Sequence, residues 1–429
     1  MSSPEHARIP TGLHGEPRRV PTSKVSFRNT FRALRHRNFR LFFYGQLVSL
    51  TGTWMEQTAM SWLIYDMTGS KFLLGAISAV GSAPMMIFSL WGGILADRYP
   101  KRNILIITQT VEMFFAFCLA VITLFHVATP TWIMIIAALN GIALGFEMPA
   151  RQAFTVEMTS KEDLLNAISL NSSIFNGARV VGPSIAGLLI ASVGTAACFF
   201  LNAFSFIAVI IGYFMMRVPP RAVPPKDAPV LHPLSGIHYV INNRRVRTIL
   251  TLFGVVGIFG WSYSVLMPAL ARDVLGLGPN GYGVLLSASG VGALTGALAV
   301  ATFGHTFTPR NMALSGVWIF SAALVALSLT SNFYVSLVLL FFSGIGMLLF
   351  FSTSNTVLQT IVPDNMRGRV MGVWSLIFGA MIPIGSLQSG AVAHWFGTQY
   401  ALAFGAIVCA ISALVALLAI RRRMAAEGA

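Results

Sequence analysis

The chain has 429 residues, of which 55% are hydrophobic and only 10% are charged, and its mean hydropathy is +0.73. Soluble proteins average about 25% charged residues, so this composition excludes an ordinary soluble domain and indicates a membrane protein. The net charge of +15 is spread thinly between apolar runs and does not gather on one phosphate-binding face. We therefore expect no nucleic-acid partner.

The sequence also argues against an enzyme. Three cysteines stand far apart within apolar runs, at positions 118, 198 and 409, in a spacing that fits neither a metal site nor a disulfide framework. The chain contains no Gly-Lys dipeptide, and therefore no Walker A loop. We expect no metal, no cofactor and no enzymatic activity.

Residues 1–38 are predicted to form a cytoplasmic tail. Arginines recur from Arg28 to Arg40, with Phe27, Phe31 and Leu34 at roughly helical spacing. This pattern predicts an amphipathic helix that lies on the anionic inner leaflet of the membrane.

Twelve apolar segments follow, each about long enough to cross a hydrocarbon core of about 30 Å. Backbone groups in lipid must be hydrogen-bonded internally, so these segments are helices. When both termini are placed in the cytoplasm, Lys71 and Arg272 are the only basic residues outside, and Arg179 is the only one deep within a span, away from its ends. The predicted spans are Phe39–Tyr65, Leu73–Ala96, Asn103–Phe125, Thr131–Met148, Leu164–Val193, Ala196–Met216, Val246–Leu270, Tyr282–Phe303, Met312–Leu329, Phe333–Phe351, Arg369–Phe396 and Tyr400–Ile420.

The spans divide into two halves of similar size. A Pro-rich cytoplasmic loop, residues 217–245, separates residues 39–216 from residues 246–420, and residues 421–429 form a second tail. The halves are related: Gly182 and Gly187 precede Gly385 and Gly390 by 203 positions, which lays the fifth span over the eleventh. We predict an all-α membrane protein in which two six-helix halves are related by an axis along the membrane normal.

A charged turn joins the second and third spans. The sequence Gly93-Ile-Leu-Ala-Asp97-Arg98-Tyr-Pro-Lys101-Arg102 resembles the signature G-x-L-a-D-r-x-G-r-[RK] of the major facilitator superfamily. It departs from that pattern at Pro100 and Lys101. Together with Met148–Met158, Leu164–Leu189 and Val362–Val373, it resembles the bacterial exporter group that includes the enterobactin exporter and macrolide efflux pumps.

The resemblance implies that the turn is a conformational latch between the halves. Asp97 would face the N-terminus of the eleventh helix, where unpaired amides favour an anion. Lys101 would pair with an acid at the cytoplasmic end of the fourth helix, and Glu147 is placed to be that acid. The alternative is a solvated turn of the positive-inside kind, although such a turn requires no acid.

Ionisable residues inside a membrane are rare and are functional candidates by default. Glu56, Glu112 and Arg179 fall within predicted spans. Glu56 is the first candidate for binding a proton or a cationic substrate, with Arg179 as its possible partner. The alternatives are a structural hydrogen bond for Glu56 and a neutral acid or local ion pair for Glu112.

Other polar and aromatic residues are predicted to line a substrate cavity of mainly apolar character, which suits an amphipathic organic molecule. An aromatic belt at the membrane interface is the alternative for each Trp and Tyr. The predicted cavity residues are Trp54, Gln57, Asn140, Asn171, Asn176, Trp261, Tyr263, Asn355, Gln359 and Trp374.

The fifth and eleventh helices carry candidate gating bends at Gly182-Pro183 and at Pro383 with Gly385. Exporters of the antiporter type in this superfamily often carry G-x(8)-G-x(3)-G-P-x(2)-G-G in the fifth helix. This chain keeps Gly182, Pro183 and Gly187 but has Ser169, Ala178 and Ala186 where glycine is usual. Close helix packing is the alternative role of the small residues.

Together these features predict a monomeric secondary transporter in the bacterial inner membrane that exports a drug-like or siderophore-like molecule in exchange for protons. Its expected partners are the small-molecule substrate, protons and the lipid bilayer. An importer or facilitator of a small metabolite has the same fold and stays open as an alternative. A lipid scramblase or a non-transporting receptor is a further one.

Overall fold

The computed structural model describes residues 31–427 except 161, 218–233 and 305, and all its described secondary structure is helical. Eleven described helices are long and apolar enough to cross a membrane. The elements are η1 (Arg32–Arg35), α2 (Arg37–Thr68), α3 (Lys71–Arg98), α4 (Lys101–Leu124), α5 (Pro130–Glu157), α6 (Leu164–Val193), α7 (Thr195–Met215), α8 (Leu234–Asn242), α9 (Arg244–Gly260), α10 (Ser262–Val265), α11 (Met267–Ala269), η2 (Leu270–Val274), α12 (Pro279–Phe303), α13 (Pro309–Ser328), α14 (Phe333–Ile361), α15 (Asp364–Phe396) and α16 (Thr398–Glu427).

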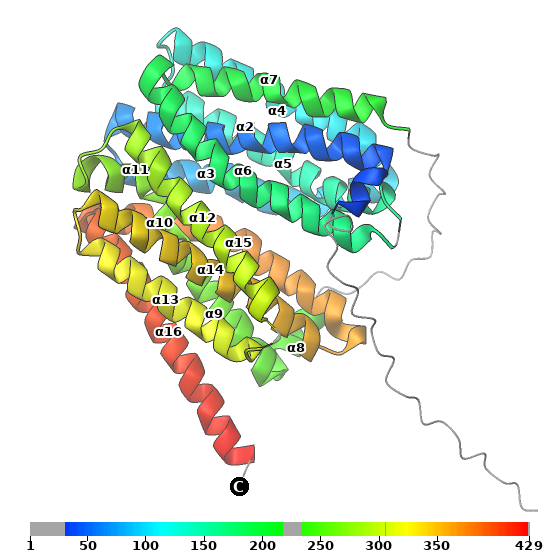
Figure 1. Ribbon diagram of the computed structural model, residues 1–429, viewed down its shortest axis with the longest axis vertical. Coiled ribbons are helices and arrows are strands. Elements are labelled where there is room, and N and C mark those ends of the chain that lie inside the picture. Colours follow the sequence, from blue (N-terminus) through cyan, green and yellow to red (C-terminus); the bar gives the residue numbers. More distant parts are fainter. Residues whose placement is uncertain (1–30, 161, 218–233, 305, 428–429) are drawn as a thin grey trace, which may run out of the picture.

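The helices form two bundles that lie side by side (Figure 1). Helices α2 to α7 make the first bundle, and α8 to α16 make the second. Helix α2 is not among the eleven apolar helices, but it has 32 residues and packs lengthwise against α6 and α7. We call the end of the molecule at which residues 98–101 join α3 to α4 the signature end, and the end at which Gly69 joins α2 to α3 the opposite end.

The predicted seventh span is broken. A single helix over residues 246–270 was expected, but α9 ends at Gly260 and is followed by α10, α11 and the π-helix η2. Pro268 lies in α11 and has no backbone N–H to donate, so it interrupts a continuous helix. The break turns Arg272 and Asp273 of η2 toward the first bundle, where Arg272 pairs with Asp66.

The stretch before α2 differs from the expected amphipathic helix. Phe27 and Arg28 lie outside the described residues, and η1 is a 3-10 helix of four residues that docks on the start of α6. Its Arg32 Nε lies 2.7 Å from Asp163 Oδ1, and His36 Nε2 lies 2.8 Å from Asp163 Oδ2. An acid at the start of α6 therefore pairs with these basic side chains.

The Asp163 contact is expected to depend on pH. The hydrogen bond with His36, and then the charge of Arg32, hold the pKa of the Asp163 carboxyl group below its usual range, which is about 4. A lowered pKa in the folded state stabilises the fold at neutral pH, and this contribution disappears as the pH falls through the lowered value. We expect Asp163→Asn to lower the melting temperature at neutral pH. The difference from the wild type should shrink when melting is measured below about pH 4.

Two seams join the bundles. In the first, α3 packs along α15: a Cβ atom on Gly75 would lie 2.3 Å from Ser386 O and 3.0 Å from Gly390 Cα, so the two backbones touch. The Ser78 and Ser386 hydroxyl oxygens are 2.8 Å apart beside this contact. Only glycine allows so close an approach of two helices.

The second seam joins α6 to α12 in the same manner. A Cβ atom on Gly187 would lie 2.8 Å from Pro279 O and 3.2 Å from Gly283 Cα. The Ser184 and Ser287 hydroxyl oxygens are 2.5 Å apart. Each seam thus pairs one helix of each bundle through a glycine contact and a serine pair, as expected for two related halves.

Both glycine contacts lie toward the opposite end of the molecule. Polar contacts add to them there: Tyr65 Oη donates to Asp273 Oδ2 at 2.5 Å, and Lys71 Nζ lies 3.3 Å from the same oxygen. Toward the signature end, a Cβ atom on Gly93, Gly177 or another glycine of α15, Gly372, would meet no described atom within 4 Å. The bundles are therefore joined most tightly at the opposite end.

Candidate functional site

The signature turn packs on the end of α5. Asp97 and Arg98 are exposed in the last turn of α3, whereas the Lys101 side chain is only 6% exposed. Lys101 Nζ pairs with Glu157 Oε1. Beside it, Arg102 Nη2 donates to Phe214 O at 3.0 Å. The turn thus fastens the start of α4 to the ends of α5 and α7.

The expected pair of Lys101 with Glu147 was wrong. An acid at the signature end of the fourth long helix is present, but it is Glu157. Because α5 continues to Glu157, nine residues beyond the predicted end at Met148, Glu147 lies about 15 Å deeper along the helix at 1.5 Å per residue. It cannot reach a lysine at the start of α4.

Glu147 belongs instead to a buried charge cluster, which we define as Glu112, Glu147 and Arg151. Arg151 Nη1 lies 3.1 Å from Glu147 Oε1, one turn away on α5. The Glu112 carboxyl group on α4 interacts with that of Glu147. Glu112 and Glu147 are 9% and 1% exposed, and one carboxyl oxygen of each has no hydrogen-bond partner among the described residues.

Polar side chains from α2 and α7 surround the cluster. Arg151 Nη1 donates to Gln46 Oε1 at 3.4 Å, and Gln46 Nε2 donates to Tyr213 Oη at 3.2 Å. Nearby, Ser49 Oγ donates to Gln109 Oε1 at 3.5 Å. The interior of the first bundle therefore contains a polar core, formed by α2, α4, α5 and α7, whose hydrogen bonds are mostly long.

Glu56 lies in the same bundle and faces α7. It is 7% exposed, and Asn202 Nδ2 donates to Glu56 Oε2 at 2.6 Å. Ser205 Oγ in turn donates to Asn202 Oδ1 at 3.1 Å. The predicted pairing of Glu56 with Arg179 was wrong, because Glu56 points into the first bundle and Arg179 points toward the second.

Arg179 bridges the two bundles. Its guanidinium carbon lies 5.7 Å from the centroid of the Trp261 ring, a cation–π distance. A Cβ atom on Gly290 of α12 would lie 3.3 Å from Arg179 O, so this contact borders the second seam. Both side chains are half-buried. They form a polar and aromatic contact near the middle of the molecule.

The predicted cavity residues fall into two groups. Trp54, Asn140, Asn171, Asn176, Trp261 and Asn355 are half-buried, and Gln57 and Gln359 are exposed. Two expectations were wrong. Tyr263 is buried, with its hydroxyl oxygen 2.6 Å from Ser289 Oγ, and the buried Trp374 ring stacks on Phe253 with centroids 3.5 Å apart. Both belong to the core of the second bundle, because helix rotation turns them away from the first bundle.

The proposed gating residues make close helix contacts. A Cβ atom on Gly182 would lie 2.7 Å from Trp54 Cβ, and one on Gly385 would lie 2.4 Å from Ile258 O. Pro183 and Pro383 both lie inside uninterrupted helices, α6 and α15. These contacts fit the packing alternative at both glycines, and a gating role stays a prediction.

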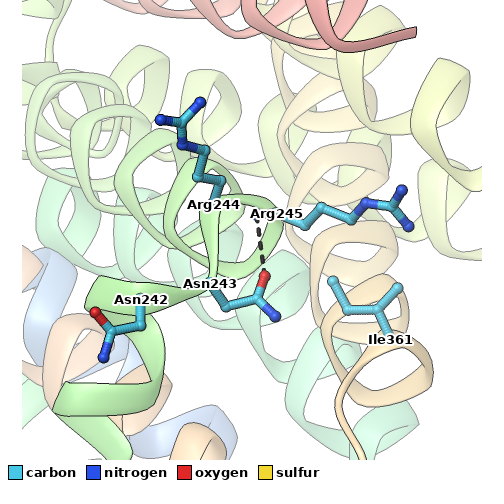
Figure 2. A pocket seen from close by; sticks show the side chains of 5 residues that line it. All are labelled: Asn242, Asn243, Arg244, Arg245 and Ile361. Atoms are coloured by element: carbon cyan, nitrogen blue, oxygen red, sulfur yellow. Dashed lines mark hydrogen bonds between the residues drawn. The ribbon is translucent and has the colours of Figure 1, made fainter. Parts of the chain in front are cut away.

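A separate pocket of about 420 Å³ opens at the signature end of the second bundle. It is lined by Asn242, Asn243, Arg244, Arg245 and Ile361, from α8, α9 and α14 (Figure 2). Asn243 caps α9, since its Oδ1 accepts from Arg245 N at 3.0 Å. The pocket contains none of the residues predicted from the sequence.

Sequence reasoning missed the hydrogen-bonding partners around the buried acids: Gln46, Ser49, Gln109, Arg151 and Tyr213 in the polar core, and Asn202 beside Glu56. A signal for Arg151 was present, because Glu147 and Arg151 are four residues apart and such residues meet on one helix face. Ending the fourth span at Met148 placed Arg151 in a loop and hid this pair. No local pattern marks Gln46 or Asn202, whose contacts depend on how α2 packs against its neighbours.

Comparisons with known proteins place these features in a family. The chain is 26% identical over 360 residues to the staphyloferrin A transporter of Staphylococcus aureus, covering 83% of this chain and 90% of that protein. It is 25% identical over 396 residues to the enterobactin exporter of Shigella boydii, covering 90% and 93%. Macrolide efflux protein A of Streptococcus pyogenes is also similar, at 23% identity over 84% of this chain and 93% of that protein.

Among solved structures, a bacterial homologue of the human lysosomal transporter Spinster, described as inward-facing and unoccupied, superimposes with a TM-score of 0.73. The match has 14% sequence identity and covers 90% of this chain and 97% of that one, so it shows the fold alone. The resemblance to exporters of the major facilitator superfamily is confirmed, as is the expectation that the chain is not an enzyme. Residues 28–428 match the family described as transmembrane secretion effector, and the chain belongs to this family of multi-pass membrane transporters.

Proposed function

We propose that this protein exports an amphipathic small organic molecule, of drug-like or siderophore-like character, across the bacterial inner membrane in exchange for protons. The names of its relatives support export: enterobactin exporter, macrolide efflux protein and multidrug efflux pump. The half-buried tryptophans and amides that we predict to line the cavity support an amphipathic cargo.

The proposal includes twelve spans, with α2 as the first, and both termini in the cytoplasm. The signature end is then cytoplasmic, and the opposite end faces outward. The distribution of basic residues supports this orientation. In this frame the protein acts as a monomer whose two halves, residues 39–216 and 246–420, are joined by the loop at residues 217–245.

One observation carries the proposed mechanism: the two seams bring the halves into backbone contact at the opposite end, whereas Gly93, Gly177 and Gly372, toward the signature end, have no described atom near their Cβ positions. In the first seam Gly75 touches Gly390, and in the second Gly187 touches Gly283. This asymmetry is what alternating access requires of an inward-facing state, in which the site between two halves is open to one side only. Because glycine has no side chain, the helices can move past each other at these contacts, and the same halves can rock into an outward-facing state.

The signature turn would act as the latch of that second state. Asp97 is exposed in the present arrangement, so it is free to meet the N-terminus of α15 when the signature end closes, because the amides of a helix N-terminus favour an anion. Gly93, Arg98, Lys101 and Arg102 would complete the turn. Lys101 is already paired with Glu157, and this ion pair would hold the turn in place while Asp97 engages α15.

Proton exchange is assigned first to Glu56. The carboxyl group is buried and bonded to the neutral amide of Asn202, an environment in which a carboxyl group can hold a proton without losing a cationic partner. We expect Glu56→Gln to reduce substrate-dependent proton movement in proteoliposomes by about 5- to 150-fold, the usual range of a coupling free energy. The measurement uses an internal pH dye and a panel of amphipathic fluorescent efflux dyes.

Glu162→Gln is the matched control, since this carboxyl group is exposed at the surface and lies outside the spans. Transport that proceeds in Glu56→Gln with wild-type proton movement would contradict the assignment. Dye that equilibrates without a pH gradient would favour a facilitator. Lipid movement that needs no solute would favour a scramblase.

A further inference from the structure

A second group of buried acids is not explained by the Glu56 assignment. The charge cluster of Glu112, Glu147 and Arg151 contains two carboxyl groups and one guanidinium group in the interior of the first bundle. If both acids were ionised, the cluster would carry a net negative charge in a setting where an unpaired charge costs several kcal/mol. One proton, shared between the two carboxyl groups, makes the cluster neutral.

The geometry supports a shared proton. Arg151 Nη1 is 3.1 Å from Glu147 Oε1, yet this oxygen has no hydrogen-bond partner among the described residues, so the guanidinium lies off the bonding direction. Oε1 of Glu112 also has no partner there. Two neighbouring buried carboxyl groups with unfilled acceptor positions can share a proton, as paired acids do when like charges meet.

The groups around the cluster do not supply a second counter-charge. Helix α2 contributes Gln46 and, at longer range, the acid Glu56; α7 contributes the hydroxyl group of Tyr213. Helix α4 adds the neutral amide of Gln109. Arg151 is thus the cation of the cluster as the described residues present it.

The cluster lies near the middle of the membrane and is held in register from the signature end. Glu112 is eleven residues after Lys101 and Glu147 is ten residues before Glu157, so both acids lie about 15 to 17 Å from the Lys101–Glu157 pair at 1.5 Å per residue. That distance is half of a hydrocarbon core of about 30 Å. The ion pair fixes antiparallel α4 and α5 so that the two acids meet.

The cluster is also connected to the first seam. Next to Glu147, the backbone of α5 touches α3, since a Cβ atom on Gly92 would lie 2.4 Å from Gly145 O and 2.9 Å from Phe146 Cα. Helix α3 is the helix that packs on α15 of the second bundle. A small shift of α5 on a change in charge therefore acts directly on a helix of the interface.

We infer that Glu112 and Glu147 share one exchangeable proton, with Arg151 as the fixed counter-charge, and that losing this proton changes the balance between the two arrangements of the bundles. The proton passes between a carboxyl oxygen and water, and no other bond changes. The inference rests on the alternating access proposed above, but it does not require that export be driven by protons or that Glu56 titrate.

The test needs no substrate. The three native cysteines are replaced by alanine, and spin labels are attached to cysteines introduced at exposed Val156 and Thr360, at the signature ends of α5 and α14. The distance between the labels is measured in lipid nanodiscs as the pH is varied around neutrality. We expect the wild-type distribution to shift with pH, whereas Glu112→Gln and Glu147→Gln each abolish the shift, because either variant leaves one acid for one guanidinium.

Infrared spectra of the same samples report the proton itself. The wild type should lose one protonated-carboxyl band as the pH rises, and both variants should lack this band. Glu162→Gln, at an exposed carboxyl group, should behave like the wild type in both measurements. These isosteric changes keep the volume of the side chains, and an intact spectrum at one fixed pH shows that the variants fold.

Two results would overturn the inference. One is a pH-dependent change in the label distance that persists in both variants, and the other is a change that disappears only in Glu56→Gln. Either could occur while proton-driven export stands, in which case the proposed function is unaffected. Conversely, a titrating pair in a protein whose export ignores the pH gradient would support the inference and refute antiport.

Discussion

Replacing Arg151 by methionine is expected to lower the free energy of unfolding by about 3–5 kcal/mol, the usual cost of removing one partner of a buried ion pair. The guanidinium lies 3.1 Å from Glu147 Oε1 and donates to Gln46 at 3.4 Å. Without it, two buried acids face each other with no cation in the cluster. The measurement is equilibrium unfolding in mixed micelles at neutral pH.

Charge, and not lost packing, should account for most of this effect. Adding Glu147→Gln to Arg151→Met removes the uncompensated acid and should restore the larger part of the lost stability. Arg244→Met serves as the surface control, since Arg244 is exposed and such changes usually stay within about 0.5 kcal/mol. If Arg151→Met is as stable as Arg244→Met, the cluster is not a buried ion pair.

Gly75→Ala is expected to shift the protein toward the state that is closed at the signature end. The added Cβ atom would lie 2.3 Å from Ser386 O and 3.0 Å from Gly390 Cα, both backbone atoms that cannot rotate aside. Overpacking of this kind costs about 1–3 kcal/mol, and it destabilises only the state in which Gly75 contacts Gly390. The balance between states should change by about 5- to 150-fold, as measured with the labels at Val156 and Thr360.

Two further variants show whether the shift comes from the seam. Gly177→Ala adds the same atom in α6 where no described atom lies within 4 Å, so it should leave the label distances unchanged. Asp97→Asn removes the proposed latch of the alternate state and should shift the distances in the opposite direction to Gly75→Ala. Equal distances in Gly75→Ala and the wild type would mean that the seam does not control the equilibrium.

The bundle could be predicted from the sequence because lipid leaves the backbone few choices. Long apolar runs must be helices, so most helices were found close to their predicted positions. The interruption at Leu266 was missed because Pro268 falls inside a mainly apolar run, and hydropathy does not register the missing N–H.

Side-chain partners were harder to predict, because they depend on helix ends and helix rotation. The sequence indicated an acid for Lys101 on the fourth long helix, but Glu147 and Glu157 lie ten residues apart on it, and an early helix end favoured the wrong one. Tyr263 and Trp374 have the composition of cavity residues and pack in a core. A rotation of about 100° per residue decides which face a side chain shares, and hydropathy does not set that angle.

The glycine seams have a consequence for how the halves move. Where Gly75 meets Gly390 and Gly187 meets Gly283, the facing helix surfaces are flat, so no interdigitated ridges need to disengage before one helix shifts along the other. Motion at the opposite end is therefore expected to begin as shear, in which α3 slides along α15 and α6 along α12 until the glycine contacts part. A small rotation that accompanies this sliding becomes a large displacement at the far ends of α3 and α15, which are 28 and 33 residues long.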